Sequence, residues 1–193
     1  MSNKKQKIHA VVEAGQKQAR KYELMVLITP SITEKKRNEA YQEVLNLITE
    51  NEGEIVSEYD LGKRDLSYTI KGNDEAFYAI VYFKTSNSDL PKVLERYFRF
   101  SHEVIRSMMV KRDDSYTHFD VTTEYDKDKE TERREKVLKS PIDYKNVTLL
   151  RNYVSRYARI VPRYYTKVSL KQQKMLAQEV KRARQVALMP FVS

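Results

Sequence analysis

The chain has no cysteine and only four glycines among its 193 residues. The lack of cysteine excludes a disulfide framework, a thiolate metal site and a cysteine nucleophile. Four glycines are too few to build the usual glycine-rich loop that cradles phosphates. No run of about 18 apolar residues is present, so the sequence offers no candidate membrane-spanning segment. Charged residues, by contrast, make up 33% of the chain.

Histidines are also scarce, and His9, His102 and His118 are the three that the chain contains. None has a second ligand-type residue at a spacing that would hold a metal ion. The paired carboxylates Asp113 and Asp114 lie in a polar stretch, where nothing would separate their pKa values. We therefore expect no catalytic residue, no metal and no cofactor, and we expect that the protein is not an enzyme.

Positive charge is concentrated in the last part of the chain. Residues 141–193 hold eleven lysines and arginines against Asp143 and Glu179, an excess of nine that equals the net charge of the whole protein. The other 140 residues are therefore neutral overall. Each cation that neutralises a phosphate releases a condensed counterion, so this segment favours a polyanionic partner, and we expect nucleic acid.

The middle of the chain alternates strand-like and helix-like patterns in the order βαββαβ. Helices are predicted after the capping box Ser31-Ile-Thr-Glu34 and after Ser88. Two helices on one face of a four-stranded antiparallel sheet would bury every apolar face, which predicts an α+β ferredoxin-like βαββαβ domain over residues 21–112. The predicted strands cover residues 22–28, 54–70 with a bend at Gly62, 76–83 and 103–110.

The remaining segments differ in composition from this domain. Residues 1–20 are basic and polar, and we expect a flexible arm. Residues 113–140 hold nine acidic and six basic residues with few large apolar ones. We expect a charged linker there, with a flexible reach on the order of 29 Å. Residues 141–193 are predicted to form a small all-α basic domain that binds RNA.

Two helices are predicted in the basic domain, one over residues 147–157 and one from Ser169 to Pro190. The second begins with the capping box Ser169-Leu-Lys-Gln172. Its helical spacing predicts an inward apolar stripe, Leu176, Val180, Ala183 and Ala187, and an outward polar face, Lys174, Gln178, Lys181, Arg182 and Gln185. Only Glu179 could pair with a cation of this helix, for example Arg182.

The loop before this helix, residues 159–167, interleaves cations with Tyr164 and Tyr165. Arginine binds phosphate with two parallel hydrogen bonds, and tyrosine rings stack on unpaired bases. We therefore expect these tyrosines to contact RNA rather than pack in the core.

At these residues the chain resembles two known families. Residues 141–193 closely resemble bacterial small-subunit ribosomal protein eighteen, and residues 21–112 resemble small-subunit ribosomal protein six. The blocks that carry the first resemblance are Ile142-Asp-Tyr-Lys-Asn-Val-Thr-Leu-Leu150, Ile160-Val-Pro-Arg163, Lys181-Arg-Ala-Arg184 and Ala187-Leu-Met-Pro-Phe-Val192. The blocks that carry the second are Lys21-Tyr-Glu-Leu24, Leu61-Gly-Lys-Arg-Asp-Leu-Ser-Tyr68 and Met108-Met-Val-Lys111.

The sequence departs from the eighteen-type pattern at a few positions. Tyr164, Met175 and Gln178 stand where that family often has arginine. Lys167 stands where it usually has glycine after the threonine. These changes concern the path of the loop and some phosphate contacts.

In these families the two proteins are separate chains that form a heterodimer. They bind the central domain of the small-subunit ribosomal RNA, on the platform of the subunit. The resemblance implies that both partners are joined here, by nature or by design, as a structural constituent of the small subunit. The ribosome would be the bacterial-type one of the cytoplasm, with an organellar one left open.

The partners implied are small-subunit rRNA, neighbouring small-subunit proteins, and the two halves with each other, in cis or in trans; no membrane is implied. Charge and resemblance together give the expected RNA-contacting residues: Lys145, Arg151, Arg156, Arg159, Arg163, Tyr164, Lys167, Lys171, Lys174, Lys181, Arg182 and Arg184, with Lys63 and Arg64 at the RNA or partner surface.

Two alternatives remain open. A translational regulator could bind messenger RNA with the same basic surface, and it would not sediment with small subunits. A ferredoxin-like ligand sensor with a basic tail would need a polar pocket on the sheet, and residues 22–112 show no pattern for one.

Overall fold

The computed structural model describes residues 19–113 and 141–192, which group into two compact units. Within the described residues, one unit comprises 19–62 and 77–113, and the other comprises 63–76 and 141–192. The expected arm over 1–20 and linker over 113–140 lie, apart from their edge residues, outside the described part of the chain.

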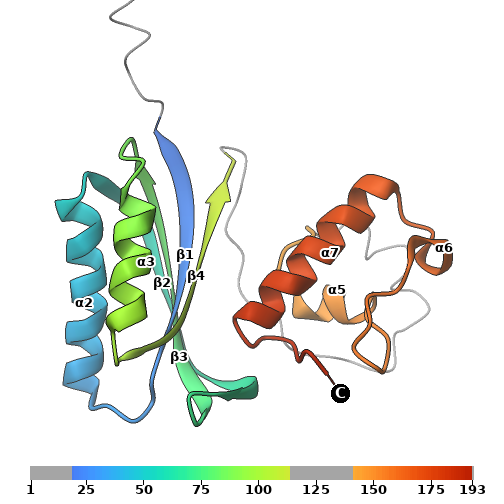
Figure 1. The fold of residues 1–193 in the computed structure, drawn as a ribbon, viewed down its shortest axis with the longest axis horizontal. Helices are drawn as coiled ribbons and strands as arrows, with labels where there is room; N and C mark the ends of the chain where they lie inside the picture. The colour runs from blue at the N-terminus through green and yellow to red at the C-terminus, as the bar shows by residue number, and fades with distance from the viewer. Residues whose placement is uncertain (1–18, 114–140, 193) are drawn as a thin grey trace, which may run out of the picture. The chain divides into compact units, whose positions relative to one another are not determined.

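Four strands form one antiparallel sheet, in the order β2-β3-β1-β4. Helices α2 and α3 lie together on one face of this sheet (Figure 1). This is the predicted α+β ferredoxin-like arrangement, which the structure confirms. The elements in chain order are β1 (Arg20–Ile28), α2 (Glu34–Glu50), β2 (Gly53–Ile70), β3 (Asn73–Thr85), α3 (Leu90–Phe100) and β4 (Val104–Arg112).

The main core lies between this sheet and its two helices. Alternate side chains of β1, Leu24, Val26 and Ile28, point to the helices because successive strand residues face opposite sides. They meet Val44, Leu45 and Ile48 of α2 and Leu90, Leu94 and Phe98 of α3.

Two glycines shape the long strand β2. Gly53 is packed so closely that a Cβ atom there would lie 2.5 Å from Cγ2 of Ile48. Gly62 has a φ of +70°, in the left-handed region, and its N–H donates to Oδ1 of Asp60 at 2.8 Å. The left-handed residue stands at the position where the sequence predicts a bend, and β2 continues through it to Ile70.

Both helices of this domain begin after the predicted residue. α2 is capped by Thr33, whose Oγ1 accepts from the N–H of Lys36, whereas Ser31 lies in the preceding turn. The N-cap of α3 is Asp89 rather than Ser88, and Asp89 makes no side-chain capping bond. Proline in the first turn of α3 removes one N–H that a cap would otherwise satisfy.

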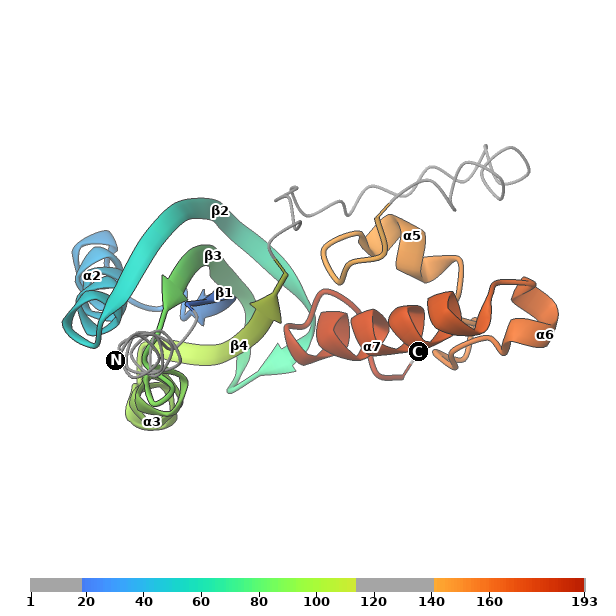
Figure 2. The same cartoon turned by 90° about the horizontal axis from the view of Figure 1, so that it is seen from above.

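The second unit combines the hairpin of residues 63–76 with three helices: α5 (Val147–Arg151), α6 (Arg163–Thr166) and α7 (Leu170–Gln185). α5 lies beside α7, and α6 lies beyond the start of α7 (Figures 1 and 2). The Ser169 capping box is confirmed, because both of its reciprocal hydrogen bonds are formed.

Both helices of the basic segment are shorter than predicted. α5 ends at Arg151 because the chain then turns back, and Val154 pairs with Ile160 in an antiparallel bridge. α7 ends at Gln185, well before Pro190, because Ala187 adopts a left-handed φ of 56°. A single left-handed residue is a common way to terminate a helix.

Candidate nucleic-acid interface

The cations of the basic segment divide into two groups by exposure. Three of the eleven, Lys145, Arg182 and Arg184, are buried or half-buried. The other eight are exposed, namely Arg151, Arg156, Arg159, Arg163, Lys167, Lys171, Lys174 and Lys181. The exposed group can meet phosphates without any rearrangement of the fold.

α7 has an inner apolar and an outer basic face, as its sequence predicts, with two exceptions. Arg182, expected on the outer face, is half-buried and pairs with Glu179, and Ala187, expected on the inner stripe, is buried but lies beyond the end of the helix. Leu176, Val180 and Ala183 are buried on the inner side. Lys174 and Lys181 are exposed, and their separation of seven positions corresponds to about 10 Å along the helix axis. The outer face of α7 therefore presents spaced cations to solvent.

Lys145 lies within a buried group of charged side chains. Lys145 is 0% exposed, Asp143 2% and Glu179 6%. Glu179 accepts from the backbone N–H of Tyr144 at 3.1 Å and pairs with the guanidinium of Arg182. These contacts tie the start of the segment to α7. The structure therefore gives Lys145 and Arg182 positions inside the fold rather than on its cationic surface.

Arg184 bonds to two carbonyls that lie far apart in sequence. Its Nε donates to the carbonyl of Pro190 at 3.1 Å, and its Nη2 donates to the carbonyl of Ala158. Ala158 sits in the turn between Val154 and Ile160 with a left-handed φ of 57°. Arg184 thus holds this turn against the end of α7.

The same turn carries a cation and an aromatic ring together. The guanidinium of Arg156 lies 4.7 Å from the ring centroid of Tyr157, and it donates to the Tyr157 hydroxyl at 2.7 Å. Tyr157 is 61% exposed. The sequence prediction did not include it, although its position between Arg156 and Arg159 repeats the interleaved pattern of the next loop.

Tyr164 and Tyr165 are both on the surface, which agrees with the expectation that they do not pack in the core. Tyr164 is 82% and Tyr165 73% exposed. Their neighbours Arg163 and Lys167 are exposed as well. Lys167 adopts a left-handed φ of 57°, at the position where the resembled family usually has glycine.

Lys63 and Arg64 lie on the hairpin of the second unit. Lys63 is exposed and pairs with Glu75 across the hairpin, with 2.5 Å between Nζ and the carboxylate. Arg64 is half-buried. Both cations therefore have interaction partners within the protein, Lys63 through Glu75 and Arg64 through another residue.

The hairpin contacts the end of the basic segment within the second unit. The backbone N–H of Ser67 donates to the carbonyl of Ala187 at 2.8 Å. The hydroxyl of Tyr68 donates to the carbonyl of Arg184 at 2.7 Å, and the ring of Tyr68 lies 5.4 Å from that of Phe191. We call these contacts the hairpin seam. Nothing in the residue pattern points to it.

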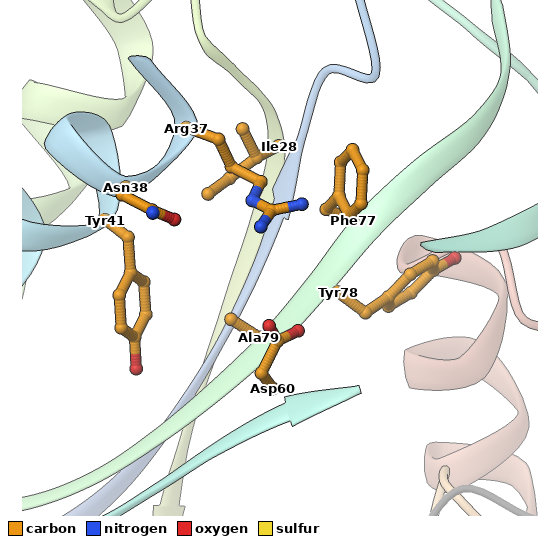
Figure 3. Close-up of a pocket in the computed structure, with 8 residues that line it drawn as sticks. All are labelled: Ile28, Arg37, Asn38, Tyr41, Asp60, Phe77, Tyr78 and Ala79. Carbon is orange, nitrogen blue, oxygen red and sulfur yellow. The ribbon is translucent and has the colours of Figure 1, made fainter. Parts of the chain in front are cut away.

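A small hollow lies between α2 and the sheet of the first unit (Figure 3). The guanidinium of Arg37 lies 4.3 Å from the ring centroid of Phe77, and Tyr41 donates to a carboxylate oxygen of Glu58 at 2.9 Å. Burial and that carboxylate raise the pKa of Tyr41. The hollow holds about 50 Å³. Pockets for small molecules usually hold about 300–1,000 Å³, so this hollow does not support a ligand sensor.

Two other kinds of feature are absent from the residues that the structure describes. No group of three or more histidine, aspartate or glutamate side chains there is placed to hold a metal ion. No helix among them is long and apolar enough to cross a membrane.

Comparison with known proteins gives two family matches. The profile of the family described as ribosomal protein S6 matches residues 21–111, and that of ribosomal protein S18 matches residues 138–189. The small ribosomal subunit protein bS6 of Caldanaerobacter subterraneus subsp. tengcongensis is 35% identical over 95 residues, which is 49% of this chain and 99% of that protein. The bS6 protein of Campylobacter jejuni strain RM1221 is 36% identical over 90 residues, 47% of this chain and 71% of that protein.

A solved structure is also similar. The crystal structure of 30S ribosomal protein S6 from Thermotoga maritima aligns with a TM-score of 0.47 and 25% sequence identity. The alignment covers 64% of this chain and all of that one.

Proposed function

The chain belongs to the ribosomal protein S6 family, with an S18-family segment behind it, and from this we propose that it binds small-subunit ribosomal RNA as two joined partners. It is a small-subunit ribosomal protein, and these are structural families, not enzymes. The finer proposal is that it binds the central domain of the RNA, on the platform, in the ribosome of the cytoplasm. The observation that carries it is the group of eight exposed cations in the S18-type segment.

The proposed RNA contacts are these eight cations together with Tyr164. Lys63 remains a proposed RNA contact. Arg64 remains a proposed contact at the surface between the two joined partners. Lys145, Arg182 and Arg184 are better explained as residues that hold the unit together, because each is buried or bonded inward. This division sharpens the expectation from charge alone, which treated all eleven cations alike.

A salt titration tests the RNA contacts of α7. We expect Lys174→Gln with Lys181→Gln to weaken binding to small-subunit rRNA. The slope of log K against log salt is negative, and it should become less steep by about 1.5–2, because two phosphate contacts are lost. The control is Lys35→Gln with Lys36→Gln, two exposed lysines of α2. An equal loss of slope in both double variants would contradict the proposal.

Sedimentation separates this function from messenger RNA regulation. The full chain should co-sediment with small subunits in a sucrose gradient, and the α7 double variant should leave that fraction at lower salt than the α2 control. A regulator that acts only on messenger RNA would remain in the light fractions with either variant.

We also propose that the two halves dock in cis. The hairpin seam supports this, because residues 63–76 continue two strands of the S6-type sheet and bond to the S18-type segment. A segment of about fifty residues is near the lower limit for an independent core, so extra surface from the hairpin would stabilise it. Because the two halves are joined in one chain, each is present near the other at a local concentration of roughly millimolar.

A backbone substitution tests the seam. Ser67→Pro removes the N–H that donates to Ala187, and proline is tolerated on an edge strand where that N–H points outward. Ser67→Ala keeps the N–H and serves as the control.

With a protease site placed in residues 113–140, the cleaved halves of the control should co-elute in gel filtration. The cleaved halves of Ser67→Pro should separate at a higher concentration than those of the control. Cleaved halves that separate equally in both variants, or uncleaved chains that dimerise as concentration rises, would argue against docking in cis.

A further inference from the structure

The tyrosine pair of α6 has no role in packing. α6 has no buried side chain, and both rings are largely exposed to solvent. The two rings lie edge to face against each other, with centroids 5.2 Å apart and an interplanar angle of 88°. Two adjacent exposed rings leave apolar surface in water that a ligand could cover.

The backbone holds this pair in a fixed place. α6 is a single turn that starts after Pro162, and the N–H of Lys167 closes it by donating to the carbonyl of Arg163 at 2.8 Å. Lys167 itself is fixed in the left-handed conformation. The backbone under the rings is already ordered, so stacking of a ligand costs only the rotamer freedom of the two side chains.

Cations stand at both ends of the turn. Arg163 begins α6 and Lys167 follows its last residue, and both are exposed. An aromatic face between two cations matches a nucleotide, which has a flat base and phosphates on either side of it. In a continuous RNA duplex the base faces are covered by their neighbours, so only an unpaired base offers a face to such a ring.

We infer that Tyr164 and Tyr165 form a stacking site for an unpaired RNA base, with Arg163 and Lys167 placed to meet the adjoining phosphates. This rests on the proposed function, which makes RNA the partner, and it adds the class of RNA element. The element is a loop or bulge with an unpaired base, and not an uninterrupted helix.

A tryptophan reporter tests the stacking directly. The chain has no tryptophan, so Tyr164→Trp introduces the sole indole and keeps an aromatic ring at the position. We expect its fluorescence to be quenched when the full chain is titrated with oligouridylate, whose bases are unpaired and hardly stack on one another. A fully paired RNA hairpin of equal length should quench much less. The control is Phe100→Trp, at a ring of α3 that is 75% exposed, which neither RNA should quench.

An affinity measurement complements the reporter. Tyr164→Ala with Tyr165→Ala should lower the affinity for oligouridylate by roughly five- to 150-fold, the range for losing one stacked base. The slope of log K against log salt should stay the same, because no charge is removed. The melting temperature should also stay the same, because α6 buries nothing.

The outcomes separate this inference from the proposed function. An unquenched indole at position 164 while labelled RNA still binds would overturn the stacking site and leave the proposed function standing. Equal quenching at position 100 would overturn it too. Failure of the unsubstituted chain to bind any RNA would overturn the proposed function itself.

Discussion

Arg184 offers a sharp test of the difference between a cation that meets RNA and a cation that holds the fold. In sequence it is one of three basic residues near the end of α7, and it resembles an RNA contact. In the structure its guanidinium donates to the carbonyls of Ala158 and Pro190. Replacement of Arg184 by alanine removes both bonds. It leaves the backbone carbonyl of Arg184, which accepts from Tyr68, in place.

The magnitude follows from the two bonds. A hydrogen bond to a charged group contributes about 1.5–3 kcal/mol, and two bonds from one group are not fully additive. We expect Arg184→Ala to cost about 2–4 kcal/mol in local stability. That corresponds to roughly 30- to 1,000-fold faster hydrogen exchange where the turn opens locally.

Hydrogen–deuterium exchange measured by mass spectrometry gives the assay. Peptides that span residues 152–162 should lose protection, whereas peptides from α2 should not change. Arg184→Lys should lose most of the same protection, because one ammonium group cannot donate to both carbonyls as the Nε and Nη2 atoms of a guanidinium do. Lys181→Ala is the matched control on the exposed face, and it should alter the salt slope of RNA binding without altering exchange.

The reasoning would be refuted by the opposite pattern. If Arg184→Ala left exchange over residues 152–162 unchanged and lowered the salt slope as Lys181→Ala does, Arg184 would be a phosphate contact. Rescue of RNA affinity by Arg184→Lys with unchanged exchange would lead to the same conclusion, because charge alone would then suffice.

Three further predictions concern stability. Ser169→Ala should lower it by about 1 kcal/mol in thermal unfolding, because the capping box with Gln172 is lost. Lys167→Gly should raise it by about 1 kcal/mol relative to Lys167→Ala, because glycine adopts the left-handed φ freely; equal melting temperatures for the two variants would argue against strain there. Burial and a neighbouring carboxylate raise the pKa of both Tyr41 and Tyr97 in the folded state. The two tyrosines therefore contribute their full share of folding stability below pH ~10, the ordinary pKa, and this share is lost as the pH rises further. Tyr41→Phe with Tyr97→Phe should flatten this alkaline loss in urea unfolding.

The fold could be predicted because the spacing of apolar residues within each strand and helix is regular and can be identified from short stretches of sequence. Strands with apolar alternation and helices with a 3.6-residue period identify βαββαβ without further information. The exact helix starts could not be predicted, because neighbouring polar residues compete as caps. Thr33 rather than Ser31 caps α2, because Ser31 still belongs to the turn that precedes the helix.

The candidate site was predictable only in outline. Charge counting located the basic segment, but it cannot distinguish an exposed lysine from one that is fully buried, such as Lys145. Ala158, a partner of Arg184, lies 26 residues away from it, and Tyr68 and Arg184 in the hairpin seam lie 116 residues apart. Such pairs are set by the tertiary fold and leave no periodic signal in the sequence.

The hairpin seam also has a consequence for the order of synthesis. Residues 63–76 leave the translating ribosome long before the segment that they contact around Ala187 and Phe191. At about 5–20 residues per second, the hairpin has a lead of several seconds to some tens of seconds, time in which a small domain folds. The residues around Ala187 and Phe191 therefore meet a hairpin that is already formed. Docking in cis, as proposed, would spare the chain the search for a second polypeptide, and each copy carries its two halves in equal number.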